Sequence, residues 1–141
     1  MKHMLFGAAM AVMAAAAAQA DEIELYFVNL EDGATVSAPV TVVFGLRGKG
    51  VAPAGVDQDG TGHHHILLNR PPFGEWPNDT EISQIGIPAD DHHIHFGGGQ
   101  TETVLDLPAG SHSLQLLLGD HFHVPHDPVV ASERITITVT E

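Results

Sequence analysis

Residues 134–140 read RITITVT, and this stretch sets the pattern for the rest of the chain. Ile135, Ile137 and Val139 alternate with threonines, so the apolar side chains fall on one face of an extended segment. β-Branched residues in strict alternation are typical of a strand with one face in a core. The stretch therefore predicts the closing strand of a packed sheet.

Strand signals also recur upstream of that stretch. They lie at residues 23–28, 40–46, 66–68, 101–107 and 114–118. Glycine and proline separate them, and no segment beyond residue 20 has clear helical periodicity. We therefore predict an all-β fold, an antiparallel immunoglobulin-like β-sandwich of six to eight strands.

One long connection interrupts the strands, from Asn69 to Gly99. Four prolines and the triple glycine at 97–99 break any regular element there, so we expect an irregular loop. A loop of that length in a small domain is more often functional than idle. The shorter GKGVAPAG at 48–55 lacks the Lys-Ser/Thr ending of a phosphate-binding loop and is interpreted as a strand connection.

The first twenty residues have the features of a secretory signal peptide. Lys2 begins a short polar region, residues 5–18 are apolar and rich in alanine, and Ala18-Gln19-Ala20 matches the cleavage pattern. A buried N-terminal helix is the alternative, and the apolar stretch is too short to span a membrane. We expect cleavage after Ala20, export to the periplasm, no membrane span, and a single domain over residues 21–141.

Composition narrows the range of partners. With 18 acidic and 5 basic residues, the chain has a formal net charge of −13 when the histidines are neutral. This charge repels nucleic acid and attracts cations, so nucleic-acid binding is excluded. The sequence has no cysteine, and its four methionines all precede residue 14, so the predicted mature chain contains no sulfur. A metal site would therefore use nitrogen and oxygen donors only.

Nine of the 11 histidines fall in three short runs, HHH at 63–65, HHIH at 92–95 and HFHVPH at 121–126. Each run contains His-x-His, which puts two imidazoles on one face of a strand about 6–7 Å apart at Cα. Three such pairs at strands or strand ends of a small sandwich can converge on one ion. The candidate metal ligands are His63, His65, His93, His95, His123 and His126.

The remaining histidines have simpler interpretations. His64 shares the parity of Ile66, so a core histidine with hydrogen-bonded nitrogens and a ligand are both open for it. We expect a solvated side chain at His92, a strand-capping hydrogen bond at His112 and an exposed ring at His121. The alternative for the whole set is a hydrogen-bonded network that stiffens loops without metal.

Imidazole and oxygen donors suit copper(II), zinc and nickel, and copper(II) has the highest affinity among these ions. Copper is therefore the expected cofactor, with a two-histidine copper(I) site and a zinc site as alternatives. Nearby carboxylates can orient a ligating imidazole by accepting its free N–H; they belong to Asp90, Asp91, Asp120 and Asp127. Because ligating imidazoles must be neutral, affinity should fall below about pH 6.

Three stretches carry a family resemblance: GVAPAGVDQDGTGHHHILLN at 50–69, PADDHHIHFGGGQTETVLDLPAGSHSLQLLLGDHFHVPHDP at 88–128 and ERITITV at 133–139. They resemble the bacterial domain-of-unknown-function family 4399, over nearly all of the chain from about Phe27 to Val139. The resemblance implies a small exported β domain and no particular reaction. The histidines that match the family's motifs are His63, His64, His65, His93, His95, His123 and His126.

Catalysis finds little support in the residues. Cysteine is absent, and no G-x-S-x-G nucleophile motif occurs. An N-terminal histidine brace is incompatible with the predicted terminus at Asp21. His63-x-His65 is similar to the first cupin motif, but Asn69 and Arg70 stand where that motif has glutamate. The His-x-His pairs are similar to the ligands of copper–zinc superoxide dismutase, but the disulfide of that family is impossible in a chain without cysteine.

Two hypotheses remain. The leading one is a periplasmic metal-binding protein for storage, delivery or sensing, with a metal ion and a periplasmic metal-handling protein as its partners. The other is a metal-independent immunoglobulin-like interaction module.

Overall fold

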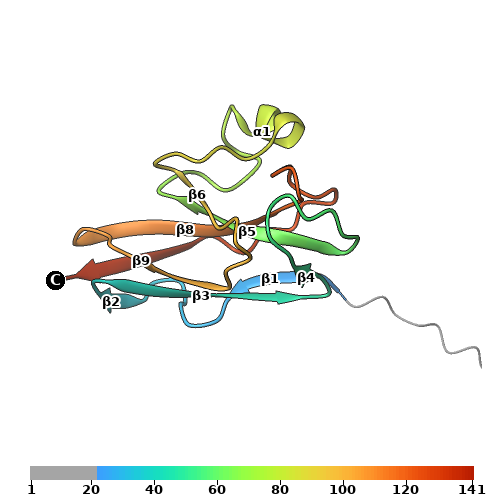
Figure 1. Ribbon diagram of the computed structural model, residues 1–141. Coiled ribbons are helices and arrows are strands. Elements are labelled where there is room, and N and C mark those ends of the chain that lie inside the picture. The colour runs from blue at the N-terminus through green and yellow to red at the C-terminus, as the bar shows by residue number, and fades with distance from the viewer. Residues whose placement is uncertain (1–21) are drawn as a thin grey trace, which may run out of the picture.

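The computed structural model describes residues 22–141, which form two β-sheets and one short helix (Figure 1). The predicted signal peptide lies outside the described residues. Within them, no helix is long and apolar enough to cross a membrane. The elements are β1 (Glu24–Phe27), β2 (Thr35–Ser37), β3 (Val40–Arg47), β4 (Gly50–Val51), β5 (Thr61–Leu68), α1 (Asp79–Ile85), β6 (His93–His95), β7 (Glu102–Leu105), β8 (Gly110–Gly119) and β9 (Ile135–Thr140).

The smaller sheet has the order β1-β3-β7, with antiparallel neighbours. The larger sheet has the order β2-β9-β8-β5-β4, with β6 paired to β5, and it curls into a half-barrel. All six predicted strand segments are present. The nine strands exceed the predicted six to eight because β2, β4 and β6 have only two or three residues, too few to show a period of two. Two of these short strands also form parallel pairs, β2 with β9 and β4 with β5, so the sheets are not wholly antiparallel.

The main core lies between the two sheets. In β5 and β8, Ile66 pairs with Leu116, and both side chains are fully buried against residues of β3 such as Val42. Ile135, Ile137 and Val139 of β9 are buried, as their alternation predicted. Burying one such side chain stabilises the fold by about 1.5–3 kcal/mol relative to exposure.

The outer face of the larger sheet is also covered, by residues 69–92, which we call the cap. Figure 1 shows α1 and its flanking loops on the side of β5 and β8 away from the smaller sheet. Leu67 and Leu117 point outward and pack with Ile82 and Ile87 of the cap in a second apolar cluster. The predicted irregular loop therefore contains a helix and the strand β6.

The helix α1 is short, which explains why its pattern was not evident in the sequence. It begins after Asn78 with Asp79 and Glu81 in its first turn, where carboxylates favour the positive end of the helix dipole. Only Asp79 and Ile82 are buried, about one helical turn apart. The helix ends before Gly86, whose φ is 109°. Seven residues with two inward side chains are too few to reveal a helical period.

Candidate metal centre

His63 and His65 lie on the outer face of β5 and are fully buried. Alternation along the strand puts both rings on one side, with ring centroids 4.7 Å apart. Strand β6 runs antiparallel beside β5 and pairs His95 with His65, so the third imidazole stacks on the second at 5.2 Å. The pairing of β5 with β6 therefore brings two of the predicted histidine runs together.

The fourth ring, that of His123, comes from the turn that follows β8. Its centroid lies 4.9 Å from that of His63 and 4.6 Å from that of His95. The Nε2 atoms of His123 and His95 are 3.1 Å apart. We call His63, His65, His95 and His123 the histidine cluster; it combines residues from all three runs.

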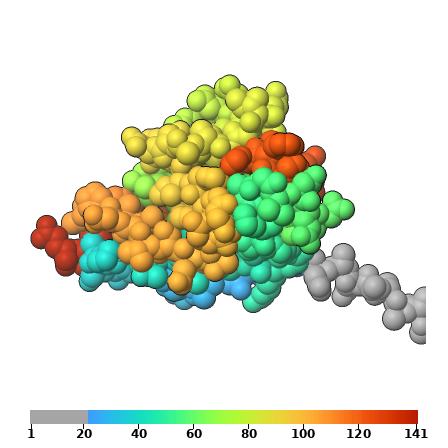
Figure 2. Space-filling model, viewed as in Figure 1, coloured from blue at the N-terminus to red at the C-terminus, as the bar shows by residue number. Residues whose placement is uncertain are grey.

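Three loops meet beside the cluster: the cap, the loop before β5 that contains Gly55, and the turn after β8. Figure 2 shows them at one corner of the molecule. The amide of Ile87 in the cap donates to the carbonyl of His123 at 2.8 Å, and the amide of Gly55 donates to the carbonyl of His121 at 3.0 Å. His63 and His65 are enclosed below this corner, whereas His95 and His123 are only half-buried. The cluster thus has a closed inner pair and an accessible outer pair.

The inner rings have no hydrogen-bond partners. Among the described residues, the only buried side-chain nitrogen or oxygen atoms without a partner are imidazole nitrogens of His63, His64, His65 and His126. Leaving a buried polar group unpaired costs about 1–3 kcal/mol. One potential ligand atom from each of His63, His65 and His95 lies within 4.8 Å of the others. A cation bound among them would give these lone pairs a partner.

Burial keeps three rings of the cluster, those of His63, His65 and His95, neutral. Burial lowers the pKa of His63 to about 4, and the neighbouring His123 and His95 lower it further. Burial, followed by repulsion from His63, lowers the pKa of His65 to about 2. Burial also lowers the pKa of His95. These rings therefore stay unprotonated at neutral pH, which is the form that binds a metal ion.

Two glycines make room for the rings. A β-carbon on Gly119, which pairs with His63, would lie 2.8 Å from Cε1 of His65. A β-carbon on Gly97 would overlap the ring of His95. Sequence reasoning did not single out either glycine for this role, because a glycine after a strand is also what an ordinary turn requires.

The predicted ligand His93 lies outside the cluster. It is paired with Leu67, farther along β5, and its ring stacks on Trp76 at 6.0 Å. Arg70 Nη1 donates to its Nε2 at 2.8 Å, and its Nδ1 donates to Asp90 at 2.7 Å. Both nitrogens of His93 are therefore engaged within the protein.

The predicted ligand His126 has no ring contact with the cluster in the described part of the chain. Its Nε2 is buried against Gly62, 2.7 Å from where a β-carbon on that glycine would be. Gly62 has the parity of His64, whose ring faces the main core. His126 therefore approaches β5 from the face opposite to that of His63 and His65.

The other histidines match their predicted environments in part. His64 faces the core, with its ring centroid 4.9 Å from that of Phe44, and burial lowers its pKa to about 4. The expected hydrogen bonds are missing, since neither ring nitrogen of His64 has a partner. His112 bonds Pro108 and Asn69 through its two nitrogens, as the capping interpretation predicted. His121 is partly exposed, 3.6 Å from Asp57.

The prediction of a solvated His92 is wrong. Its Nδ1 donates to the carbonyl of Leu68 at 2.9 Å, and its ring lies against the edge of Trp76. The cap folds back over the sheet and half-buries the side chain.

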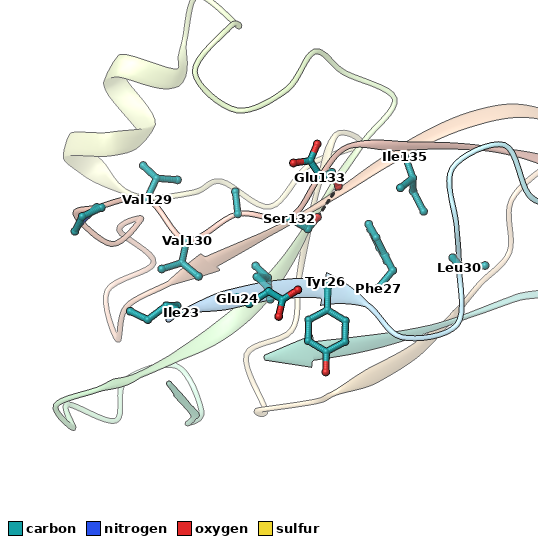
Figure 3. Close-up of a pocket in the computed structure, with 13 residues that line it drawn as sticks. Ile23, Glu24, Tyr26, Phe27, Leu30, Val129, Val130, Ser132, Glu133 and Ile135 are labelled. Carbon is teal, nitrogen blue, oxygen red and sulfur yellow. Dashed lines mark hydrogen bonds between the residues drawn. The ribbon is translucent and has the colours of Figure 1, made fainter. Parts of the chain in front are cut away.

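A separate pocket of about 580 Å³ lies between β1 and residues 128–133 (Figure 3). Its lining is largely apolar, with Ile23, Val129 and Val130 at one end and Phe27 and Ile135 at the other. None of its lining residues is a histidine. The concentration of ligand-type side chains is therefore at the histidine cluster.

Comparisons with known proteins identify a family and no activity. A search among curated proteins found no match. Among solved structures, the endo-β-1,4-mannanase from Thermotoga petrophila is similar over 85% of this chain and 20% of its own, with 18% identity and a TM-score of 0.46. This chain thus spans a fifth of that enzyme, and the likeness supports no conclusion about fold or activity. Residues 42–140 match the family described as a domain of unknown function, DUF4399, and the chain therefore belongs to that family.

Proposed function

We propose that this protein binds a transition-metal ion through His63, His65, His95 and His123, and that the preferred ion is copper. The observation that carries the proposal is the pair of fully buried strand histidines, His63 and His65, whose ring nitrogens have no hydrogen-bond partner. Their ligand atoms lie within 4.8 Å of one on His95. Neutral imidazoles held together in this way, in an acidic protein, form a cation site.

The distances within the cluster suit a small ion. Zinc–imidazole bonds of about 2.0–2.1 Å in a tetrahedral site separate the ligand nitrogens by about 3.3 Å, and a tetragonal copper(II) site brings neighbouring nitrogens somewhat closer. The Nε2 atoms of His95 and His123 are already 3.1 Å apart. The separations of up to 4.8 Å among His63, His65 and His95 require small ring rotations toward a common centre.

The donor set favours copper. All four candidate ligands are nitrogens, which suit copper(II), zinc and nickel, and copper(II) binds such sites most tightly. The absence of cysteine excludes thiolate ligation. A two-histidine copper(I) site and a zinc site are the alternatives. Together with the predicted export, these features support copper storage, delivery or sensing in the periplasm.

The test is metal binding by untagged protein. Metal analysis after purification from the native periplasm, followed by titration with copper(II) against zinc, should show one tightly held copper ion per chain. His63→Ala and His65→Ala should lose it, while His92→Ala, a half-buried histidine outside the cluster, should keep it. If dialysis against EDTA and addition of copper leave the melting temperature unchanged, the proposal fails.

A metal-independent interaction module is the second candidate. We propose that its scaffold is immunoglobulin-like, since the order β1-β3-β7 against β9-β8-β5 corresponds to strands A-B-E against G-F-C of that fold. Two exposed apolar side chains, Phe122 and Ile85, favour partner binding. Partner binding that persists unchanged in EDTA and in His63→Ala would support this function over the first.

A further inference from the structure

Asp120 organises the turn that carries His123. One carboxylate oxygen, Oδ1, accepts hydrogen bonds from the amide of Phe122 at 2.8 Å and the amide of Val124 at 2.9 Å. The backbone of Asp120 also closes the turn, because its amide donates to the carbonyl of Val124 at 2.8 Å and its carbonyl accepts from the amide of His123 at 2.9 Å. The residues on both sides of His123 are therefore bound to one side chain.

His123 has an unusual backbone conformation within this turn. Its φ is 68°, in the left-handed region that residues other than glycine seldom adopt. The only other non-glycine residue with positive φ in the described chain is Asn69, and asparagine and histidine enter this region more often than most residue types. In this conformation the ring of His123 reaches 3.1 Å from His95. Non-glycine residues persist in such conformations only where their surroundings fix them.

We propose that Asp120 is the positioning residue for His123, holding it in the left-handed conformation so that its ring completes the metal site as the fourth ligand. This inference rests on the proposed metal-binding function. The positioning depends on one oxygen atom, because Oδ1 accepts the hydrogen bonds from both amides. An asparagine at this position keeps that oxygen, whereas an alanine does not.

The chain offers a matched control in Asp90. Its Oδ1 likewise accepts an amide, that of His92 at 2.8 Å, and it also contacts the ring of His93. The residues that Asp90 contacts, His92 and His93, lie outside the cluster. Asp90→Ala therefore removes the same kind of contact without moving a proposed ligand.

The experiment measures copper(II) affinity by chelator competition, and the number of bound nitrogens by electron paramagnetic resonance. Asp120→Ala should weaken binding about 10–100-fold, the range seen when a group that orients a ligand is removed. It should also lose one nitrogen, as should His123→Ala. Asp120→Asn and Asp90→Ala should keep the wild-type nitrogen count and lose much less affinity than Asp120→Ala.

The double variant Asp120→Ala/His123→Ala should bind copper no more weakly than His123→Ala alone. A wild-type affinity and nitrogen count in Asp120→Ala would overturn the proposal. So would an equal loss from Asp120→Ala in the presence and in the absence of His123, because Asp120 would then act independently of that ring.

A measurement on the metal-free protein separates this proposal from the proposed function. The NMR coupling between the amide and α protons, with the ¹³C shifts of His123, reports whether its φ is positive. If wild-type protein binds no copper, the proposed function fails, and the role of Asp120 is still tested by these signals. They should change in Asp120→Ala and persist in Asp120→Asn. A left-handed His123 in folded Asp120→Ala would overturn the role of Asp120 whatever the protein binds.

Discussion

The imidazole of His65 packs over the backbone of Gly119, where a β-carbon would lie 2.8 Å from Cε1 of the ring. The two residues are on neighbouring strands, and Gly119 pairs with His63 in the register of β5 and β8. The inner pair of the cluster therefore depends on a position on β8 that has no side chain.

Gly119→Ala should weaken copper binding by about tenfold or more, because the ring of His65 must rotate away from the new methyl group. The measurement is competition with a copper chelator of known affinity. Gly50→Ala is the control, since its β-carbon would meet nothing closer than 3.4 Å. Equal affinities for Gly119→Ala and wild type would show that the ring of His65 does not need this space.

His64→Leu should stabilise the metal-free protein by about 1–2 kcal/mol. His64 is fully buried in the main core and neither of its nitrogens has a partner, so a leucine removes an unpaired polar group. Urea unfolding provides the measurement. His112→Leu is the matched control and should destabilise the protein, because His112 bonds the Pro108 carbonyl and Asn69. Easier unfolding of His64→Leu would contradict the core interpretation.

The metal-free protein should lose stability as the pH falls from about 6.5 toward 4. Burial lowers the pKa of His63 and His64 to about 4 from an ordinary 6.5. Below pH 6.5 these histidines become protonated in the unfolded chain and stay neutral in the folded chain. Each ring therefore lowers the free energy of unfolding by up to about 1.4 kcal/mol for each pH unit of acidification. Above about pH 7.5 the contribution of these rings is constant.

Urea midpoints at pH 7.5, 6.0 and 5.0 measure this dependence. The variant His64→Leu should show a shallower decline than the wild type, because one ring with a lowered pKa is gone. A midpoint that stays constant between pH 7.5 and 5.0 would be incompatible with neutral buried rings.

Arg70→Ala should destabilise the protein by about 3–5 kcal/mol, because it leaves Asp79 buried without its partner. The Arg70 guanidinium lies 2.6 Å from that carboxylate, with both side chains nearly inaccessible, and it also covers Trp76 at 4.5 Å. Thermal or urea unfolding measures the loss. Arg47→Ala breaks an exposed ion pair with Glu24 and should cost at most about 1 kcal/mol. Similar losses of unfolding free energy in Arg70→Ala and Arg47→Ala would mean that the buried ion pair of Arg70 with Asp79 does not stabilise the cap more than an exposed pair would.

The β fold was readable from the sequence wherever a strand is long and one of its faces meets a core. β9 shows this clearly, since its isoleucines are buried and its threonines are not. The helix α1 and the short strands were not readable, because each has too few residues for a period to appear. The parallel pairs of β2 and β4 arise from tertiary packing and have no local signal.

The adjacency of His63 and His65 was also readable, because alternation alone puts both on one face of a strand. The pairing of β5 with β6 and the turn after β8, which bring His95 and His123 to them, have no local signal. The separate environments of His93 and His95 were not readable either. Both have the same parity on β6, and what distinguishes His93 is that Arg70 and Asp90 of the cap engage its two nitrogens. A distant charged partner of this kind leaves no periodic trace in the sequence.

Copper binding by the histidine cluster is tested most directly by a crystal structure of the protein with one equivalent of copper, with diffraction measured at the copper absorption edge. One anomalous peak is expected, about 2.0 Å from a ring nitrogen of each of His63, His65, His95 and His123. A peak elsewhere on the chain, with the rings of His63 and His65 still unliganded, would contradict it.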